Sequence, residues 1–193
     1  MADCVWLLRH GATEWTEEGR HTGRDEVPLS EAGREQARKA GSFLAGRPFE
    51  HVLVSPQIRA RETCSLAGFG AHAEPRDELV EWDYGEYEGL TDEQTQQRHP
   101  GWDLFRDGCP GGESPRQVAD RVDRLLAEVS GLSGTCLLVG HGKSLRALAA
   151  RWVQLTVAHG SILPMDPAAI SLLEREPAGP LLRLWNFTGE LAD

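Results

Sequence analysis

Two histidines flanked by glycine are the residues of this sequence best suited to chemistry. One lies in Arg9-His10-Gly11, directly after the apolar run 5–8, and the other lies in Gly140-His141-Gly142, after the run 135–139. A neutral imidazole can attack phosphorus, and nearby cations stabilise the charge that spreads over the phosphoryl oxygens. Because Arg9 adjoins His10, the pattern indicates phosphoryl transfer.

Arg59 is a second candidate for binding the phosphoryl group. It follows Ser55-Pro56, which ends a third apolar run at 52–54. A guanidinium presents a planar fork of donors that matches phosphate, so two arginines arriving from neighbouring strand ends favour a dianionic target. His141 is a candidate donor to the same oxygens, because Gly140 and Gly142 allow the backbone to approach closely.

A phosphoryl transfer also needs a group that carries a proton to or from the alcohol or water. Carboxyl groups are the natural candidates, and four of them follow one another at Glu81, Asp83, Glu86 and Glu88. Their spacing does not rank them. A metal site made from His10 and His141 has no recognisable carboxylate partner and conflicts with the nearby arginines.

The elements that must position these residues alternate between strands and helices. Helices are predicted from Ser30 to about 45, from Ser55-Pro56 with the proline in the first turn, and from 142 to about 154. Another helix is predicted from Ser114-Pro115, with Gln117 completing a capping box. The runs 169–173 and 181–185 read as two closing strands joined by a turn.

This alternation predicts an α/β fold with a mostly parallel sheet covered by helices on both faces. Ligands of such sheets bind beyond the carboxyl ends of the strands, where both histidines and Arg59 are expected. With 193 residues, the chain is expected to form a single domain over 1–193. The segment 76–114, rich in Gly, Pro, acids and aromatics, is expected to form an irregular cover over the active site.

The net charge and the cysteine content indicate which binding partners and which cellular compartment to expect. The formal charge of -10 disfavours nucleic acid and anionic membrane surfaces. The first apolar run is too short for a signal peptide or a membrane span, and the four cysteines lie far apart without a C-x-x-C pair. We therefore expect a cytoplasmic protein with reduced thiols and no structural metal; the sequence leaves a homodimer open.

The ordered motifs of nearly the whole chain resemble those of the histidine phosphatase superfamily, which contains cofactor-independent phosphatases and phosphoglycerate mutases. The resemblance implies a phosphoglycerate mutase-like three-layer α/β/α sandwich. It also makes His10 the nucleophile that becomes phosphohistidine, Glu81 the proton donor and acceptor, and Arg9, Arg59 and His141 the phosphate pocket. The matching segments are 8–11, 13–15, 21–24, 28–30, 55–63, 81–89 and 140–142.

Further substrate contacts are expected around this pocket. By resemblance, Thr22 and Gly23 belong to a substrate loop, Gly142 follows the second histidine, and Thr16 stands where mutases usually carry Asn. Lys143 stands where mutases carry an amide; it either binds a second anionic group on the substrate or is solvated at a helix start. Tyr84 is expected, with Trp102 and Phe105, either to line the leaving-group space or to pack in a small aromatic cluster.

The expected reaction is hydrolysis of small phosphate esters in two steps, without a metal or another cofactor, and with a pH optimum on the acid side of neutrality. A phosphoglycerate mutase is the alternative, but only 60 positions separate Glu81 from His141, which is short for the segment that mutases use to exclude water. The stretch 102–114 resembles a subgroup of broad acid phosphatases and sugar bisphosphatases. A non-catalytic phosphate-binding scaffold is a third hypothesis, disfavoured because all five central residues are present.

Overall fold

The structure is a computed structural model, and it describes residues 4–189. Its centre is a six-stranded sheet in the order β3-β2-β4-β1-β5-β6. Four of these strands run parallel, and β5 and β6 are antiparallel additions at one side, with β5 paired to β1. The strands span β1 Cys4–Arg9, β2 His51–Val54, β3 Ala73–Pro75, β4 Thr135–Gly140, β5 Ile170–Glu176 and β6 Gly179–Phe187.

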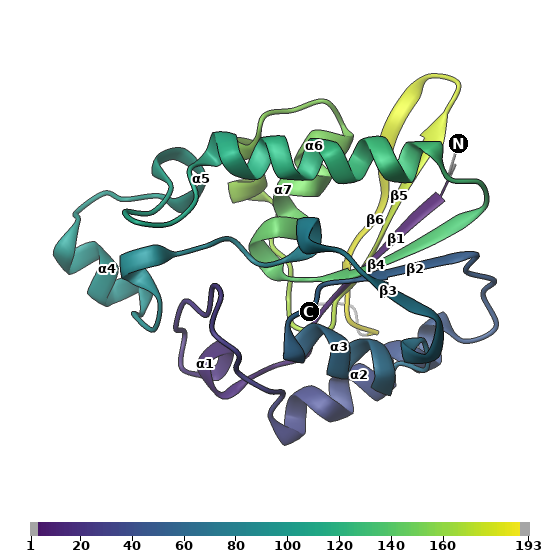
Figure 1. Ribbon diagram of the computed structural model, residues 1–193, viewed down its shortest axis with the longest axis horizontal. Coiled ribbons are helices and arrows are strands. Elements are labelled where there is room, and N and C mark those ends of the chain that lie inside the picture. The colour runs from purple at the N-terminus through teal and green to yellow at the C-terminus, as the bar shows by residue number, and fades with distance from the viewer. Residues whose placement is uncertain (1–3, 190–193) are drawn as a thin grey trace.

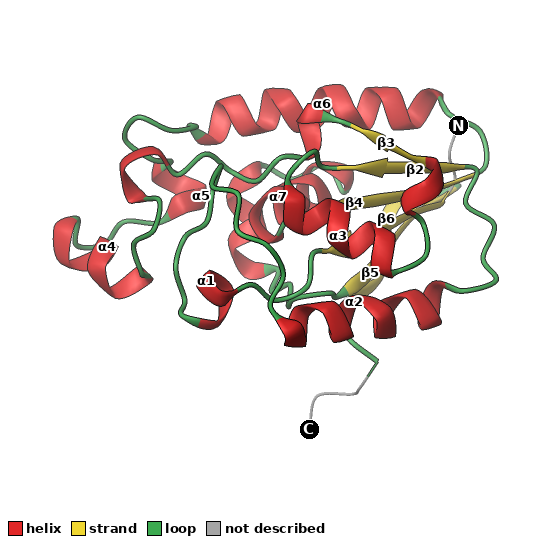
Figure 2. Cartoon of the chain, turned by 60° about the horizontal axis from the view of Figure 1, so that its bottom comes forward, coloured by secondary structure: helices red, strands yellow, loops and turns green. Residues whose placement is uncertain are grey.

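Helices cover both faces of the sheet and make the three layers (Figures 1 and 2). The helices α2 (Glu31–Leu44) and α3 (Ile58–Leu66) pack on one face, and α6 (Pro115–Gly131) and α7 (Gly142–Trp152) pack on the other. Successive residues of a strand point to opposite faces, so β1 sends Val5 and Leu7 toward α6 and α7, and Trp6 and Leu8 toward α2 and α3. The expected fold is confirmed.

Local sequence signals account for the ends of two helices. Ser30 accepts a hydrogen bond from Gly33 N at the start of α2, and Ser114 with Gln117 forms the expected capping box at the start of α6. The two closing strands also form as expected. The last long helix ends at Trp152, slightly earlier than predicted, and Gln154 adopts a positive φ of 64° beyond it.

The predicted helix start at Ser55-Pro56 is wrong, because α3 begins at Ile58 with Gln57 as its N-cap. Tertiary hydrogen bonds made by the side chains of Ser55 and Gln57 explain the delay. The Ser55 hydroxyl bonds to His141 Nε2, and the Gln57 side chain donates to Gly23 O and accepts from Glu81 N. The freed Ile58 N–H donates to the Glu26 carboxylate, which replaces a local cap.

The segment 76–114 is more regular than the sequence indicated. It contains α4 (Asp92–Arg98), which begins with a capping box of Thr91 and Gln94, and the short α5 (Leu104–Asp107), capped by Asp103. The short helix α1 (Glu14–Glu17) precedes α2. Short 3-10 helices span 70–72, 77–79, 85–87 and 157–162. No helix within residues 4–189 has the length and apolar character needed to cross a bilayer.

The loop after β1 packs against α2 so closely that only glycine fits at Gly33. A Cβ there would lie 2.0 Å from the backbone oxygen of Ala12. We expect Gly33→Ala to lower the free energy of unfolding by about 1–3 kcal/mol, the usual cost of overpacking, in denaturant titrations. Gly131→Ala is the matched control, because a Cβ at this helical glycine meets nothing within 4 Å. Equal stability of both variants would contradict the close approach.

Candidate active site

The predicted site residues meet at the carboxyl ends of β1, β2 and β4. His10 follows β1, Arg59 projects from α3 after β2, and His141 follows β4. His10 and Arg59 line a cavity of about 190 Å³ at this edge of the sheet. The predicted residues that line it are Arg9, His10, Thr16, Thr22, Arg59, Glu81, Tyr84, Gly142 and Lys143, whereas Gly23 and His141 lie behind its wall.

The His10 ring has a defined tautomer. Its Nδ1 lies 2.7 Å from the carbonyl oxygen of Gly11, and because a carbonyl can only accept, Nδ1 carries the proton. The opposite nitrogen, Nε2, therefore holds a lone pair. Burial, together with the positive charges of Arg59 and Arg9, holds the pKa of His10 well below its ordinary value. A buried neutral imidazole of this kind is a competent nucleophile.

Arg9 brings a cation to the same cavity. One of its terminal nitrogens donates to the carbonyl oxygen of Met165, while its Nε is buried without a hydrogen-bond partner. The guanidinium lies against Gly142, where a Cβ would approach within 3.2 Å of its Cζ and Nε. Glycine after the second histidine thus leaves the space that this guanidinium occupies.

Arg59 is fully buried and is fixed at three of its donor positions. Its terminal nitrogens donate to Asp25 O at 2.7 Å and Gly23 O at 2.8 Å, and its Nε donates to His141 Nδ1 at 3.1 Å. Gly23 therefore orients Arg59 through its carbonyl group. The pKa of Arg59 is lowered by burial, but a guanidinium remains charged at any physiological pH.

His141 is also neutral, because burial and the charge of Arg59 hold its pKa well below the ordinary value. Since Nδ1 accepts from Arg59, the proton lies on Nε2, which donates to the Ser55 hydroxyl at 2.7 Å. The rings of His10 and His141 lie 5.1 Å apart. Both nitrogens of His141 are thus occupied by protein groups, and its ring braces Arg59.

Glu81 is held at the N-terminus of α7. Its Oε1 accepts three hydrogen bonds, from Trp82 N, Ser144 N and the Ser144 hydroxyl, whereas its Oε2 accepts one, from Lys143 N. Backbone N–H groups at a helix start are natural partners for a carboxylate. Oε2 is the oxygen with a free position, so it is the one able to exchange a proton with a ligand.

A buried ion pair anchors the segment that carries Glu81. Arg121 of α6 donates two hydrogen bonds of 2.9 Å to the Glu113 carboxylate and two more to the carbonyl oxygens of Glu78 and Val80. Burial alone would raise the pKa of Glu113, but the hydrogen bonds and charge of Arg121 hold it below the ordinary value. Sequence reasoning missed this pair and Gln57, because their partners are far away along the chain.

Several further residues line the cavity without having been predicted as site residues. His21 stacks on Tyr84, with ring centroids 4.5 Å apart, and Arg146 shares the cavity wall with Lys143. Arg146 could have been found from its spacing, because positions three apart share one helix face. The complete set of these unpredicted lining residues is Gly19, Arg20, His21, Asp92, Arg146 and Met165.

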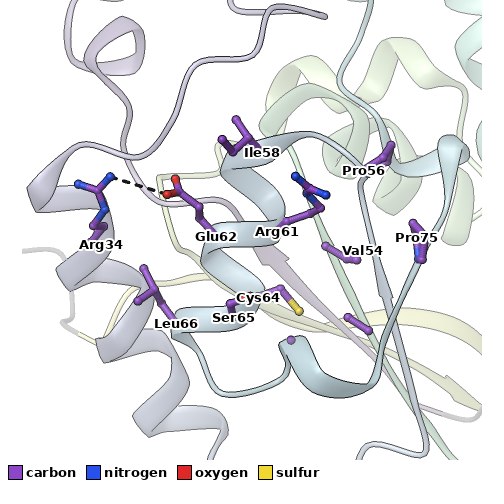
Figure 3. Close-up of a pocket in the computed structure, with 12 residues that line it drawn as sticks. Arg34, Val54, Pro56, Ile58, Arg61, Glu62, Cys64, Ser65, Leu66 and Pro75 are labelled. Atoms are coloured by element: carbon purple, nitrogen blue, oxygen red, sulfur yellow. Dashed lines mark ion pairs between the residues drawn. The ribbon is translucent and has the colours of Figure 1, made fainter.

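A larger cavity of about 780 Å³ lies beside α3 and β3, away from the histidines (Figure 3). Its Glu62 is already engaged by Leu29 N and by an ion pair with Arg34. Burial raises the pKa of the Cys64 thiol to about 12, which removes it as a nucleophile. We therefore assign the chemistry to the histidine-containing cavity. No group of three or more His, Cys, Asp or Glu suited to a metal occurs within residues 4–189.

A pocket with two guanidinium groups, a neutral histidine and a carboxyl group at the strand ends defines a class of phosphoryl-transfer proteins. Comparison with known proteins agrees with this class. The model of the histidine phosphatase superfamily (branch 1) matches residues 5–188, and the chain belongs to this family.

Three relatives illustrate the similarity. The chain is 43% identical over 187 residues to an acid phosphatase of Mycobacterium tuberculosis, covering 95% of this chain and 92% of the relative. It is 32% identical over 186 residues to sedoheptulose 1,7-bisphosphatase of Saccharomyces cerevisiae, covering 80% and 68%. The solved structure of a mycobacterial glucosyl-3-phosphoglycerate phosphatase complexed with VO3 superposes with a TM-score of 0.86, at 32% identity and 96% and 99% coverage.

The neutral, buried histidines predict that stability falls in mild acid. Because the pKa of His10 and His141 is lowered by folding, the unfolded chain binds protons first, below about pH 6.5. For each of the two rings, the free energy of unfolding then falls by up to about 1.4 kcal/mol per pH unit. The fall ends when the pH reaches the pKa of that ring in the folded protein. We expect His10→Gln to flatten the fall of unfolding free energy between about pH 6.5 and 5. The exposed His72→Gln is the control, and equal slopes for both would refute this account.

Removing Arg121 should loosen the Glu81 segment. Arg121→Met leaves the buried carboxylate of Glu113 without its ion-pair partner. We therefore expect the free energy of unfolding to fall by about 3–5 kcal/mol and kcat to be lower. Adding Glu113→Gln should restore part of that stability. Arg151→Met is the matched control, since the pair of Arg151 with Asp123 is more exposed and is worth about 1 kcal/mol or less. Equal losses from the two arginine variants would refute the anchoring role.

Proposed function

We propose that this chain is a phosphomonoester hydrolase that acts through a phosphohistidine at His10. The observation that carries the proposal is the His10 tautomer, which leaves Nε2 unprotonated in a cavity lined by Arg9 and Arg59. Family membership supports the same conclusion. The substrates are small phosphate esters.

In the first step, His10 Nε2 attacks phosphorus and forms a P–N bond while the ester P–O bond breaks. The leaving oxygen takes a proton from Glu81 Oε2 and departs as the alcohol. Nδ1 keeps its proton, so the phosphorylated ring is cationic, and the Gly11 carbonyl oxygen accepts its hydrogen bond. Arg9 and Arg59 stabilise the charge on the three peripheral oxygens.

In the second step, water attacks the phosphorus of the phosphohistidine. Ionised Glu81 accepts one proton of the water while the P–N bond breaks. The products are monohydrogen phosphate, neutral His10 with its proton still on Nδ1, and a protonated Glu81 that is ready for the next first step. Two in-line displacements give retention of configuration at phosphorus. The guanidinium groups of Arg9 and Arg59 supply the positive charge that metal ions supply in other phosphatases. In this scheme the reaction therefore proceeds without a metal.

His141 acts in this scheme mainly as a positioning residue. Its Nδ1 accepts from Arg59 and its Nε2 donates to Ser55, so it fixes the plane of the Arg59 guanidinium. Thr16 and Thr22 line the cavity and are proposed to contact the phosphoryl oxygens, while Gly23 contributes through Arg59.

The whole chain acts as one domain, with 76–114 contributing Glu81, Tyr84 and Asp92 to the cover of the site. A reducing compartment, the cytoplasm, suits the thiols of Cys64, Cys109 and Cys136. The mutase alternative lacks a supporting observation in the cavity.

The decisive assay measures phosphate release from p-nitrophenyl phosphate in the presence of a chelator. We expect turnover by wild type and a loss of at least about a thousandfold in kcat for His10→Ala, because nucleophilic catalysis is removed. The exposed His72→Ala is the control and should retain activity. Quenching in alkaline denaturant should trap the acid-labile phosphohistidine in wild type and in His72→Ala, but not in His10→Ala.

The same assay separates the competing functions. Isomerisation of 3-phosphoglycerate without free phosphate would replace the hydrolase with a mutase. Absence of turnover on every ester, with phosphate still bound, would favour a scaffold. Turnover that disappears with the chelator would contradict the metal-free mechanism.

A further inference from the structure

The turn 163–169, which leads into β5, touches both residues that follow one another at the end of β1. The carbonyl oxygen of Met165 accepts a hydrogen bond from the Arg9 guanidinium. Farther along the turn, Ala168 N donates to the carbonyl oxygen of His10 at 3.0 Å. The position of this turn therefore affects the phosphoryl cavity, although most of the turn lies outside it.

The backbone of this turn is strained. Ala168 has a φ of 55°, in the left-handed region that residues with a Cβ rarely adopt. A strained conformation persists only where the surrounding contacts hold it in place. Met165 and Ala168 are buried, but Asp166 between them is exposed, so the exposed side of the turn depends on a neighbouring element for support.

Strand β6 supplies that support. Asn186 Oδ1 accepts a hydrogen bond of 2.6 Å from Asp166 N, and Asn186 Nδ2 donates one of 2.8 Å to Asp166 Oδ2. The preceding residue of the strand, Trp185, donates from its ring nitrogen to the carbonyl oxygen of Pro164. Two consecutive residues of β6 thus bind the turn on either side of Met165.

An irregularity in the sheet makes this double contact possible. Consecutive side chains of a regular strand point to opposite faces, so Trp185 and Asn186 would normally diverge. Here β5 has one residue, Ser171, between two paired positions where β6 has both Trp185 and Asn186. Asn186 takes a φ of 57°, and its N–H donates to the Ser171 hydroxyl at 3.1 Å. Such a bulge redirects a side chain, and bulges are frequent beside active sites.

We propose that Asn186 is a positioning residue for Arg9. Its amide holds Asp166, and through this turn the Met165 carbonyl keeps the Arg9 guanidinium beside the phosphoryl cavity. Arg59 has an acceptor at three donor positions, whereas Arg9 Nε has none in the described part of the chain, so Arg9 depends more on its one carbonyl partner. The inference rests on the proposed hydrolase, in which Arg9 binds the phosphoryl group.

The first test removes the amide and keeps a backbone that tolerates positive φ. We expect Asn186→Gly to lower kcat/KM for p-nitrophenyl phosphate about tenfold, since misplacing a group by about 1 Å can cost up to about a hundredfold. The inhibition constant of inorganic phosphate should rise by a similar factor. Gln154→Gly is the matched control, because Gln154 has a φ of 64° at an exposed position beyond α7. It should leave both values unchanged.

The second test asks whether Asn186 acts through Arg9. A merely structural role would weaken phosphate binding whether or not Arg9 is present. Phosphate affinity is therefore measured by phosphorus NMR titration, which reaches millimolar dissociation constants, for wild type, Asn186→Gly, Arg9→Gln and the double variant. We expect Asn186→Gly to weaken binding in the wild-type background and to change it by less than about twofold in the Arg9→Gln background.

An exchange of the two partners supplies the rescue. Asn186→Asp sets two carboxylates against each other and should weaken phosphate binding. Adding Asp166→Asn restores one carboxylate and one amide at the same two positions, so it should recover most of the wild-type affinity. A requirement for asparagine only because of its positive φ does not predict this recovery.

Three results would overturn the positioning role. They are an Asn186→Gly variant that matches Gln154→Gly in both kinetic values, an equal loss of phosphate affinity with and without Arg9, and a folded exchange variant that binds phosphate no better than Asn186→Asp. A wild type that hydrolyses no phosphate ester would instead overturn the proposed hydrolase. Phosphate binding by the same variants still tests the role of Asn186, so the two failures are distinguishable.

Discussion

The structure depends on one electrostatic constraint: two guanidinium groups must be held beside a neutral imidazole at the edge of the sheet. Desolvation disfavours both cations, and their combined field disfavours a proton on His10. Without rigid acceptors, these cations would turn toward solvent. The protein therefore surrounds them mainly with backbone carbonyl groups, which orient a charge without neutralising it.

The choice of carbonyl acceptors explains much of the surrounding loop structure. The carbonyl oxygens of Gly23 and Asp25 fix Arg59, and that of Met165 fixes Arg9. These acceptors come from two loops far apart in the sequence, one with Gly23 and Asp25 and one with Met165, and the loops around the cavity are held by further hydrogen bonds. Gln57 makes one such tie, since its amide joins Gly23 O to Glu81 N. The guanidinium charge thus stays available to a ligand while every support remains neutral.

How much of this arrangement the sequence predicts depends on whether the signal is local. The strand ends, and with them the positions of His10, Arg59 and His141, follow from short apolar runs that stop at glycine or proline. The capping boxes are equally local. Gln57, Arg121 and His21 were missed because their roles depend on partners distant in the sequence. The backbone of His21, for example, forms hydrogen bonds with Leu90 and Gly89. The displaced start of α3 has the same cause, since tertiary bonds to Ser55 and Gln57 compete with helix formation.

The role expected for His141 shows a different limit. Its chemical type and the glycines beside it are equally consistent with a donor to phosphate and with a brace for Arg59, and only the hydrogen bonds decide which nitrogen carries the proton. In the free protein, Nδ1 of His141 accepts from Arg59 and Nε2 donates to Ser55, an arrangement that residue type alone does not predict.

The cavity is lined by several cations, whereas the chain as a whole is acidic, and this difference in charge affects which anions reach the site. The chain carries a formal charge of -10, yet Arg9, Arg20, Arg59, Lys143 and Arg146 all line the phosphoryl cavity. Charges separated by more than about 8–10 Å are screened at physiological salt, so the acidic exterior repels large polyanions that must contact much of it. A small ester enters within the range of the cavity's own cations. The cations of the cavity therefore attract a compact phosphate ester at short range, whereas the acidic exterior disfavours a large polyanion.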